Sequence, residues 1–296
     1  MLELIYIHNY IKFLGDFLDK IIEYMLAEDE GFGDITSDAV VEEGKVVNGS
    51  IVSKDNGVLA GIDIIHELFE EFGVKVLFWM KDGAKISPGD VLMSFVGEAR
   101  SILLLERTAL NLLMRMSGVA TAANHYVNLI GNSHVRIAGT RKTSPAIGKF
   151  DKYALKVGGA DTHRFSLDDM VLIKDNHIAS CGTPLETLLK AKQNVSFSKK
   201  IEIEVETLDD AVDCVKNGAD IVMLDNMNSS QVKEVIDKLN EFNIRQNSLI
   251  EVSGGITEKN ISDYADLGVD IISIGALTHS SRSLNFSLRI EEQSQS

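Results

Sequence analysis

The strongest chemical signal in this chain is a set of basic residues carried by three short motifs. These are Thr140-Arg141-Lys142-Thr143, His163-Arg164 and Lys174-Asp175-Asn176-His177. The apolar run Met170-Val171-Leu172-Ile173 ends directly at Lys174. A cation at the end of a buried strand is costly unless an anion meets it. The motifs therefore predict a pocket for a small, multiply charged anion.

The overall composition limits the kinds of partner. The chain has 296 residues and a formal net charge of -15, with ordinary globular values of 45% hydrophobic and 25% charged residues. Nucleic acids and anionic membranes need a basic face, so the charge argues against both as main partners. An anion must instead be caught by a local cationic pocket.

The N-terminal region is apolar, but Glu3, Lys12 and Asp16 interrupt it. No apolar span of ~20 residues exists there, and the basic start and cleavage site of a signal peptide are missing. Apolar side chains recur at helical spacing from Tyr10 to Met25. This spacing predicts an amphipathic helix that docks on a domain or on a partner subunit.

The two cysteines bear on the cellular location of the protein. Cys181 and Cys214 form no CxxC pair and no disulfide framework. We expect two buried, inert thiols in a reducing cytoplasm, because free cysteine is often buried.

Residues 1–118 predict a first domain. Residues 1–45 are mostly helical in pattern, 46–98 have the alternation of strands and turns, and 99–130 carry the apolar stripe of a long helix. This order predicts a small α/β sandwich, on which the tail 280–296 packs back.

Residues 119–279 predict a second domain with a different rhythm, in which short apolar runs alternate with helical segments. Gly218 and Gly268 follow two of these segments where a positive φ is needed. Strand and helix repeats at this spacing imply parallel strands. The region is shorter than the ~250 residues of a full barrel, so we expect an open, incomplete α/β barrel of six or seven strands, with a doubly wound sheet as the alternative. The strand runs are Val135–Ala138, Met170–Ile173, Ile201–Val205, Asp220–Leu224, Leu249–Val252 and Asp270–Ile274, and the helical segments are Leu208–Asn217, Gln231–Phe242 and Glu258–Leu267.

The ends of these strands carry chemistry of three kinds, and active sites gather at the carboxyl ends of parallel strands. Arg and Lys suit carboxylates or phosphates. Glu204 and Asp225 are hard oxygen ligands, suited to Mg²⁺ or to ribose hydroxyls. Ser253-Gly254-Gly255 and Gly275-Ala276 expose backbone N–H groups before helices, which favours phosphate.

Several of these residues also have a purely structural interpretation. Arg141 and Lys142 could form a solvated turn, His163 a satisfied core histidine, and His177 a cap for its loop. Glu202, Glu204 and Glu206 alternate on one face of a strand. Solvent is an unlikely surrounding for that face in a parallel barrel, so at least one glutamate is expected in a site.

In order along almost the whole chain, the motifs resemble those of the quinolinate phosphoribosyltransferase family. The resemblance runs from Glu30-Gly31-Phe32-Gly33-Asp34-Ile35-Thr36 to Gly275-Ala276-Leu277-Thr278-His279. It implies an N-terminal α/β sandwich and an open barrel, in a homodimer whose site is shared between subunits. Between the two ends it includes Glu106-Arg107-Thr108-Ala109-Leu110-Asn111, Lys152-Tyr153-Ala154, Glu202-Ile203-Glu204-Val205, Leu224-Asp225-Asn226, Ser253-Gly254-Gly255 and the three basic motifs.

The resemblance also implies roles for individual residues. The carboxylates of quinolinate would be held by Arg141, Lys142, His163, Arg164 and Lys174, with Arg107 reaching in from the partner subunit. Phosphoribosyl pyrophosphate would be held by Glu204, Asp225, Ser253, Gly254, Gly255, Ser273, Gly275 and His279. Glu204 and Asp225 would bind Mg²⁺, partly through the substrate. Lys142, Lys174, Glu204 and Asp225 would be the catalytic set.

The implied reaction joins quinolinate and phosphoribosyl pyrophosphate. It yields nicotinate mononucleotide, pyrophosphate and CO₂, the activity of a cytoplasmic pentosyltransferase of NAD biosynthesis. Mg²⁺ is the implied cofactor, and no organic cofactor is needed. Rival hypotheses are a related phosphoribosyltransferase for a different base, including the relatives of molybdenum-transport operons, and a non-catalytic sensor of the same ligand.

Two departures from the family pattern stand out. The family has Pro-Gly-x-Arg after the Thr-Arg-Lys-Thr run, where this chain has Pro145-Ala146-Ile147-Gly148 followed by Lys149. Lys149 is a candidate to replace the arginine missing at Gly148. The N-terminal extension is also longer than is typical of the family.

Overall fold

The computed structural model describes residues 20–131 and 134–291. The chain divides into two compact units. Of the described residues, unit 1 contains 20–118, 145–150 and 282–291; unit 2 contains 119–131, 134–144 and 151–281. The N-terminal helix predicted from Tyr10 to Met25 lies partly outside the described residues, which are helical over 20–30.

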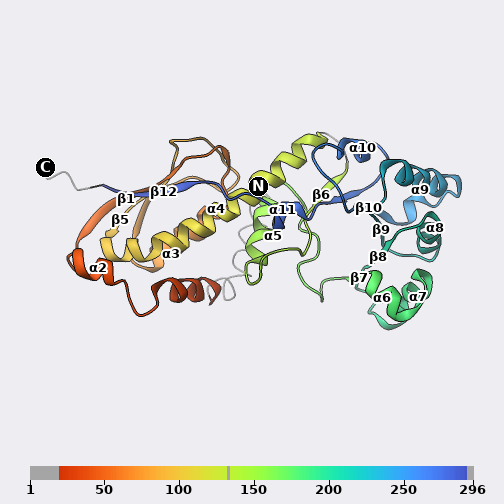
Figure 1. Ribbon diagram of the computed structural model, residues 1–296, viewed down its shortest axis with the longest axis horizontal. Coiled ribbons are helices and arrows are strands. Elements are labelled where there is room, and N and C mark those ends of the chain that lie inside the picture. The colour runs from red at the N-terminus through yellow and green to blue at the C-terminus, as the bar shows by residue number, and fades with distance from the viewer. Residues whose placement is uncertain (1–19, 132–133, 292–296) are drawn as a thin grey trace. The chain divides into compact units, whose positions relative to one another are not determined.

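Unit 1 is built on a four-stranded antiparallel sheet in the order β12-β1-β5-β3 (Figure 1). The C-terminal strand β12 pairs with β1, with Ser53 opposite Phe286. A separate two-stranded pair joins β2 and β4. The strands are β1 (Val46–Ser53), β2 (Gly57–Val58), β3 (Lys75–Trp79), β4 (Lys85–Ile86), β5 (Val91–Glu98) and β12 (Phe286–Glu291).

The helices of unit 1 supply the apolar cover of this sheet. On α3 (Ile62–Glu71), Ile65 and Phe69 are fully buried, and the Phe69 ring lies 4.9 Å from that of Phe95 on β5. The short helix α2 (Ile35–Val40) begins at Asp34, whose carboxylate accepts from the amides of Thr36 and Ser37. The predicted long helix is α4 (Ala99–Ile130). Its residues 99–118 belong to unit 1 and its remainder to unit 2.

Unit 2 contains six parallel strands in the order β6-β11-β10-β9-β8-β7. Four of the neighbouring pairs follow chain order, and in the fifth pair the first strand, β6, lies beside the last, β11. This is the cyclic order of a barrel rather than of a doubly wound sheet, and the ring is open between β6 and β7. The prediction of an open, six-stranded barrel is confirmed. The strands are β6 (Arg136–Ala138), β7 (Val171–Ile173), β8 (Ile201–Val205), β9 (Ile221–Asp225), β10 (Leu249–Ser253) and β11 (Ile271–Ser273).

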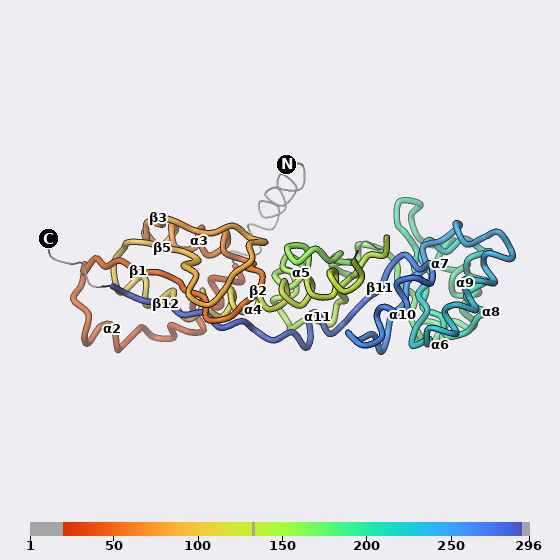
Figure 2. The backbone as a smooth tube through the Cα atoms, turned by 90° about the horizontal axis from the view of Figure 1, so that it is seen from above, coloured from red at the N-terminus to blue at the C-terminus, as the bar shows by residue number. Residues whose placement is uncertain are grey.

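Helices follow the strands of unit 2, and α7, α8 and α9 lie along the outer side of the sheet (Figures 1 and 2). Gly218 and Gly268 have the predicted positive φ. The segment predicted as a helix over 258–267 is helical only at Ser262–Ala265, since Thr257 and Asn260 form a turn before it. The helices are α5 (Gly148–Val157), α6 (Asp175–Cys181), α7 (Pro184–Asn194), α8 (Leu208–Lys216), α9 (Ser229–Glu241), the 3₁₀ turn Arg245–Asn247, α10 (Ser262–Ala265) and α11 (Ala276–His279).

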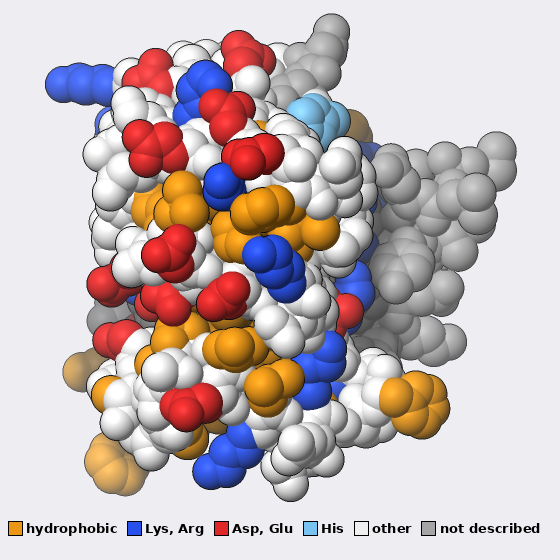
Figure 3. All heavy atoms as spheres, turned by 90° about the vertical axis from the view of Figure 1, so that its right-hand side faces the viewer, with side chains coloured by type: hydrophobic (Ala, Val, Ile, Leu, Met, Phe, Trp, Pro, Cys, Tyr) orange, Lys and Arg blue, Asp and Glu red, His pale blue; other side chains and the backbone are white. Residues whose placement is uncertain are grey.

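The core of unit 2 comes from the strands, where Ile203, Val222 and Ile250 are fully buried. Near-continuous apolar runs are typical of strands covered on both faces. On the surface shown in Figure 3, acidic and basic side chains are intermixed, with scattered apolar ones between them. In the described part of the chain, no helix is long and apolar enough to span a membrane.

Cys214 is buried, which raises the pKa of its thiol to about 12, whereas Cys181 is exposed. The expectation of two buried thiols is therefore wrong for Cys181, which ends α6 at the surface.

Candidate active site

A cavity of about 430 Å³ opens at the carboxyl ends of the strands of unit 2. It brings together ten of the residues singled out from the sequence, which lie between positions 141 and 273 of the chain. Those ten are Arg141, Lys142, His163, Arg164, Lys174, Glu204, Asp225, Ser253, Gly254 and Ser273.

Strand register builds one wall of this cavity. Ser253 on β10 lies opposite both Asp225 on β9 and Ser273 on β11. Glu204 on β8 is paired with Met223, two residues before Asp225. Because these strands run parallel, their functional side chains end at one edge of the sheet. We call Glu204, Asp225, Ser253 and Gly254 the strand-end wall.

The two carboxylates of the strand-end wall influence each other. Partial burial and the negative charge of Glu204 both raise the pKa of Asp225, while Lys174 and the Asn226 amide lower it. Lys174 forms an ion pair with Glu204, whose side chain is only 12% exposed. The single ammonium of Lys174 faces two carboxylates, which leaves this part of the cavity rich in hard oxygen donors.

Gly254 turns the chain where the strand-end wall begins. Its φ is +88°, and a Cβ there would lie 2.2 Å from Oδ1 of Asn226. The Asn226 amide Nδ2 donates to Asp225 Oδ2 at 2.6 Å, and its backbone N–H donates to Ser253 O at 2.9 Å. Only glycine allows this close approach of two strand ends.

The opposite wall is cationic and comes from segments outside the regular strands. Arg141 and Lys142 are exposed and follow β6 in a tight turn, in which Lys142 N donates to Thr140 Oγ1 at 3.1 Å. Thr278 Oγ1 donates to the Lys142 carbonyl at 2.8 Å and ties this turn to α11. We call Arg141, Lys142, His163 and Arg164 the cationic wall.

Arg164 is the more enclosed of the two arginines. Burial, followed by the charge of Arg141, lowers its pKa. Its Nη1 donates to the carbonyl of Met170 at 3.3 Å. Two guanidinium groups that repel each other at a cavity wall favour a bound anion, and carboxylates match their planar geometry.

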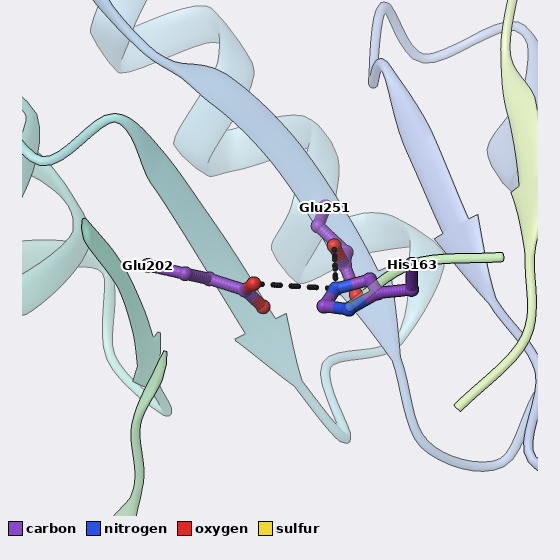
Figure 4. A group of neighbouring side chains, drawn as sticks. All are labelled: His163, Glu202 and Glu251. Atoms are coloured by element: carbon purple, nitrogen blue, oxygen red, sulfur yellow. Dashed lines mark ion pairs between the residues drawn. The ribbon is translucent and has the colours of Figure 1, made fainter. Parts of the chain in front are cut away.

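His163 lies at the floor of the cavity, with its side chain 11% exposed (Figure 4). Its Nε2 lies 3.2 Å from a carboxylate oxygen of Glu202 and 3.3 Å from one of Glu251. Burial opposes a charge on the ring, but the two glutamates outweigh it and raise the pKa of His163 to about 10. Burial also raises the pKa of Glu202.

Lys152 holds the turn that carries His163 and Arg164. It is 2% exposed and its Nζ donates to the carbonyl of Thr162, next to His163. Burial lowers the pKa of this lysine to about 8, although the carboxylate of Asp161 raises it. The sequence motif Lys152-Tyr153-Ala154 thus lies beneath the site, where its ammonium holds a turn.

Four other predicted residues do not line this cavity. Gly255, Gly275 and His279 belong to unit 2 but lie outside the cavity lining; a Cβ on Gly275 would lie 3.2 Å from His279 Nε2 and 3.3 Å from Lys142 Cδ. Arg107 lines a separate cavity of about 320 Å³ in unit 1 with Glu28, Asp29 and Arg115.

Two further expectations concern neighbouring residues. His177 is a loop cap, because its Nδ1 accepts from the backbone N–H of Lys174 at 3.0 Å. Lys149 lies on α5 within the segment assigned to unit 1, and its replacement of the missing arginine stays a prediction.

Several lining residues had no role assigned to them from the sequence, although Thr140 and Asn226 belong to the quoted motifs. Leu172 and Met223 provide apolar surface, Gly139 and Thr140 form the turn before Arg141, and Asn226 braces Asp225. Glu251 was hidden inside the run Leu249–Val252, which was interpreted only as a buried strand. A charged residue in the middle of such a run was the available signal.

Comparison with known proteins agrees with this geometry. The model of the quinolinate phosphoribosyl transferase C-terminal domain matches residues 119–289, and that of the N-terminal domain matches residues 34–117. A protein from Methanocaldococcus jannaschii named probable nicotinate-nucleotide pyrophosphorylase (carboxylating) is 48% identical over 94% of this chain and 98% of its own length. The enzyme of that name from Mycobacterium leprae is 37% identical over 90% of this chain and 95% of its own.

Solved structures point the same way. The crystal structure of NadC from Streptococcus pyogenes superposes with a TM-score of 0.86 at 36% identity, covering 93% of this chain and 97% of that one. The nicotinate-nucleotide pyrophosphorylase from Ehrlichia chaffeensis gives a TM-score of 0.87 at 35% identity, covering 92% and 98% of the two chains. Both domain models match the chain, and the relatives cover nearly their whole length in it. The chain therefore belongs to the quinolinate phosphoribosyl transferase family.

Proposed function

We propose that this protein transfers the phosphoribosyl group of phosphoribosyl pyrophosphate to quinolinate and decarboxylates the product, giving nicotinate mononucleotide, pyrophosphate and CO₂. One observation carries the proposal: a single cavity joins a cationic wall to a wall of carboxylates and free strand ends. A dicarboxylate base and a phosphorylated sugar need these two surfaces side by side.

The first chemical step joins the two substrates. The pyridine nitrogen attacks the anomeric carbon, a C–N bond forms, and the C–O bond to pyrophosphate breaks. Arg141 and Arg164 hold the two carboxylates of the base, with Lys142 beside them, so that the ring nitrogen faces the sugar. Glu204 and Asp225 bind the ribose hydroxyls and stabilise the positive charge that develops on the ribose. Backbone N–H groups at Ser253 and Gly254 receive a phosphate.

The second step is loss of the 2-carboxylate as CO₂. The electron pair of the broken bond stays on the ring carbon beside the quaternary nitrogen, whose positive charge stabilises it, and a proton from water then adds to that carbon. The arginines of the cationic wall orient the carboxylates for this step, and the cationic ring nitrogen provides the driving force. Because the ring cation stabilises this electron pair, the step needs no electron-accepting cofactor.

Mg²⁺ is the proposed cofactor, and the donor set fits it. Glu204 and Asp225 are hard oxygen ligands, and partial burial together with their mutual repulsion raises the pKa of Asp225. When bound, the ion supplies charge that offsets the leaving pyrophosphate. We also propose a cytoplasmic location, which the unpaired Cys181 and Cys214 support.

The assay that tests this function combines quinolinate, phosphoribosyl pyrophosphate and Mg²⁺ and measures CO₂ and pyrophosphate release. Equal amounts of both products support the proposal. Turnover of nicotinate without CO₂ would instead favour a phosphoribosyltransferase for another base. Tight binding of quinolinate without pyrophosphate release would indicate a sensor.

We further propose a homodimer in which Arg107 of one subunit completes the site of the other. In support, Arg107 is 57% exposed and lines a cavity that also holds the cation Arg115. Mixing inactive Arg107→Ala and Arg164→Ala chains tests this, because each mixed dimer regains one intact site. Activity should recover to about a quarter of the wild-type value in a random mixture. No recovery, with mixed dimers present, would contradict the shared site.

A further inference from the structure

The turn that carries His163 and Arg164 is strained. His163 has a φ of +53°, in the left-handed region that residues other than glycine rarely adopt. Such conformations persist only where their surroundings over-determine them, and they cluster at ligand sites. The contacts that hold this turn therefore bear on what the turn does.

The backbone of the turn is fixed from two sides. His163 N donates to Asp161 Oδ1 at 2.8 Å, and Asp161 is joined to Ala138 of β6 by a parallel bridge. Lys152 holds the carbonyl of Thr162 from the other side. These contacts set the path of the chain but leave the imidazole ring free to rotate.

The ring is held by two buried carboxylates that the proposed chemistry does not use. The side chains of Glu202 on β8 and Glu251 on β10 are both 0% exposed (Figure 4). They approach the same ring nitrogen of His163 from two strands that are separated in the sheet by β9. Burying two like charges together is unfavourable unless a partner compensates them. Among the described residues, Nε2 of His163 lies 3.2 and 3.3 Å from the two carboxylates, and burial raises the pKa of Glu202, which reduces the charge that the group must carry.

The other ring nitrogen shows where the proton lies. Nδ1 of His163 accepts the backbone N–H of Arg164 at 2.8 Å, so it carries a lone pair. A second ring proton would have to sit on Nδ1 and displace the Arg164 N–H, which offsets the effect of the glutamates on the pKa of the ring. This contact places the first ring proton on Nε2, on the side of the two glutamates.

The same contact argues against a metal ion at these three side chains. Their ligand atoms lie within 4.8 Å of one another, as in a metal site. A histidine that binds a metal through Nε2 normally donates from Nδ1. Here Nδ1 is an acceptor, so Nε2 is protonated and has no lone pair to offer.

We propose that Glu202 and Glu251 are positioning residues for the dicarboxylate base. Their close approach to Nε2 of His163 holds the ring, which presents Nδ1 to the Arg164 amide and aims the Arg164 side chain at the cavity. This inference rests on the proposed function, since the base is the ligand of Arg164. Its effect is expected on binding of the base and not on the sugar phosphate, which the strand-end wall holds.

The kinetic test uses the double variant Glu202→Gln/Glu251→Gln, which keeps the shape of both side chains and removes their charge. The KM for quinolinate should rise about 10-fold or more, because small misplacements of binding groups are costly. The KM for phosphoribosyl pyrophosphate should stay unchanged. The melting temperature should not fall, since two buried like charges have been removed. Thr183→Ala is the control, because it removes the side-chain cap of α7, where Thr183 Oγ1 accepts the Glu186 N–H at 3.2 Å, outside the cavity lining; it should lower the melting temperature and leave both KM values unchanged.

The outcomes separate positioning from simple structural support. A lower melting temperature with both KM values unchanged would overturn the proposal. So would an equal rise in both KM values. The wild-type protein is assayed first. A lack of turnover with the two substrates would contradict the proposed function, but it would not test the contacts between His163 and the two glutamates.

A spectroscopic test is independent of turnover. In protein labelled with ¹⁵N-histidine, and with His163→Asn used for assignment, the wild type should show one protonated and one unprotonated ring nitrogen for His163. The double variant should lose this asymmetric pattern and show exchange between tautomers. Two protonated ring nitrogens in the wild type, or a pattern unchanged in the double variant, would overturn the proposal that Glu202 and Glu251 position the ring of His163.

Discussion

The two walls of the cavity are made in different ways. The strand-end wall follows from register: once β8, β9 and β10 pair, Glu204, Asp225 and Ser253 meet at one edge. The cationic wall has no such template, because its arginines lie on turns beside the open side of the barrel. It depends on individual buried side chains to hold its shape. Variants should therefore affect the two walls separately.

Arg164→Ala should give the largest effect, on the cationic wall alone. We expect kcat/KM for quinolinate to fall about 100-fold, because charge-assisted hydrogen bonds to a carboxylate are lost. The KM for phosphoribosyl pyrophosphate should change little. Steady-state kinetics with both substrates varied measures this. Arg282→Ala, which removes an arginine that is 85% exposed, is the control and should be silent. Wild-type kcat/KM in Arg164→Ala would refute the assignment.

Asp225→Asn tests the strand-end wall. The substitution keeps the size of the side chain and removes one of two hard anionic ligands, so activity should fall about 30-fold and the Mg²⁺ concentration for half-maximal rate should rise. Binding of quinolinate alone, followed by calorimetry, should be retained. Asp237→Asn on α9, an exposed ion-pair partner of Lys233, provides the matched control. An unchanged Mg²⁺ requirement would place the ion elsewhere.

Gly254→Ala should have a smaller effect on the same wall. Its Cβ would meet Asn226 Oδ1 at 2.2 Å, so Asn226 must move and release Asp225. We expect the KM for phosphoribosyl pyrophosphate to rise about 10-fold. Gly255→Ala is the comparison variant. Gly255 also has a positive φ, but nothing lies within 4 Å of its Cβ position, so this variant introduces backbone strain without a steric clash. Equal effects in the two variants would show that backbone strain alone is responsible.

Lys152→Met should give the smallest effect, seen in the pH dependence of stability. Burial lowers the pKa of Lys152 to about 8 from 10.5. Between these values the unfolded chain binds the proton and the folded protein does not, so this lysine makes the free energy of unfolding rise with pH, by about 1 kcal/mol per pH unit. Denaturant titrations from pH 7 to 10 should show that slope missing in Lys152→Met. Lys156→Met on the same helix should keep it; loss of the slope there as well would contradict the assignment.

The sequence predicted the strand-end wall well and the cationic wall only in part. Alternating apolar runs located all six strands, and parallel pairing then requires their ends to meet. The types of the basic residues were equally visible. The pairing of His163 with Glu251 was not, because it depends on a turn with a positive φ and on contacts between residues far apart in the chain. Local patterns do not encode such contacts. The helix predicted over 258–267 was too long for a similar reason, since the Thr257–Asn260 turn competes with it.

The open side of the barrel has a consequence for how this fold can diversify. The segment between β6 and β7 is joined to the sheet at the Ala138–Asp161 bridge, and it carries the whole cationic wall but none of the strand-end wall. Under the proposed function, a graft that exchanges residues 139–170 between relatives would swap the part that selects the base while keeping the part that handles the activated sugar. The gap in the ring thus makes the choice of acceptor a replaceable module on a constant donor site.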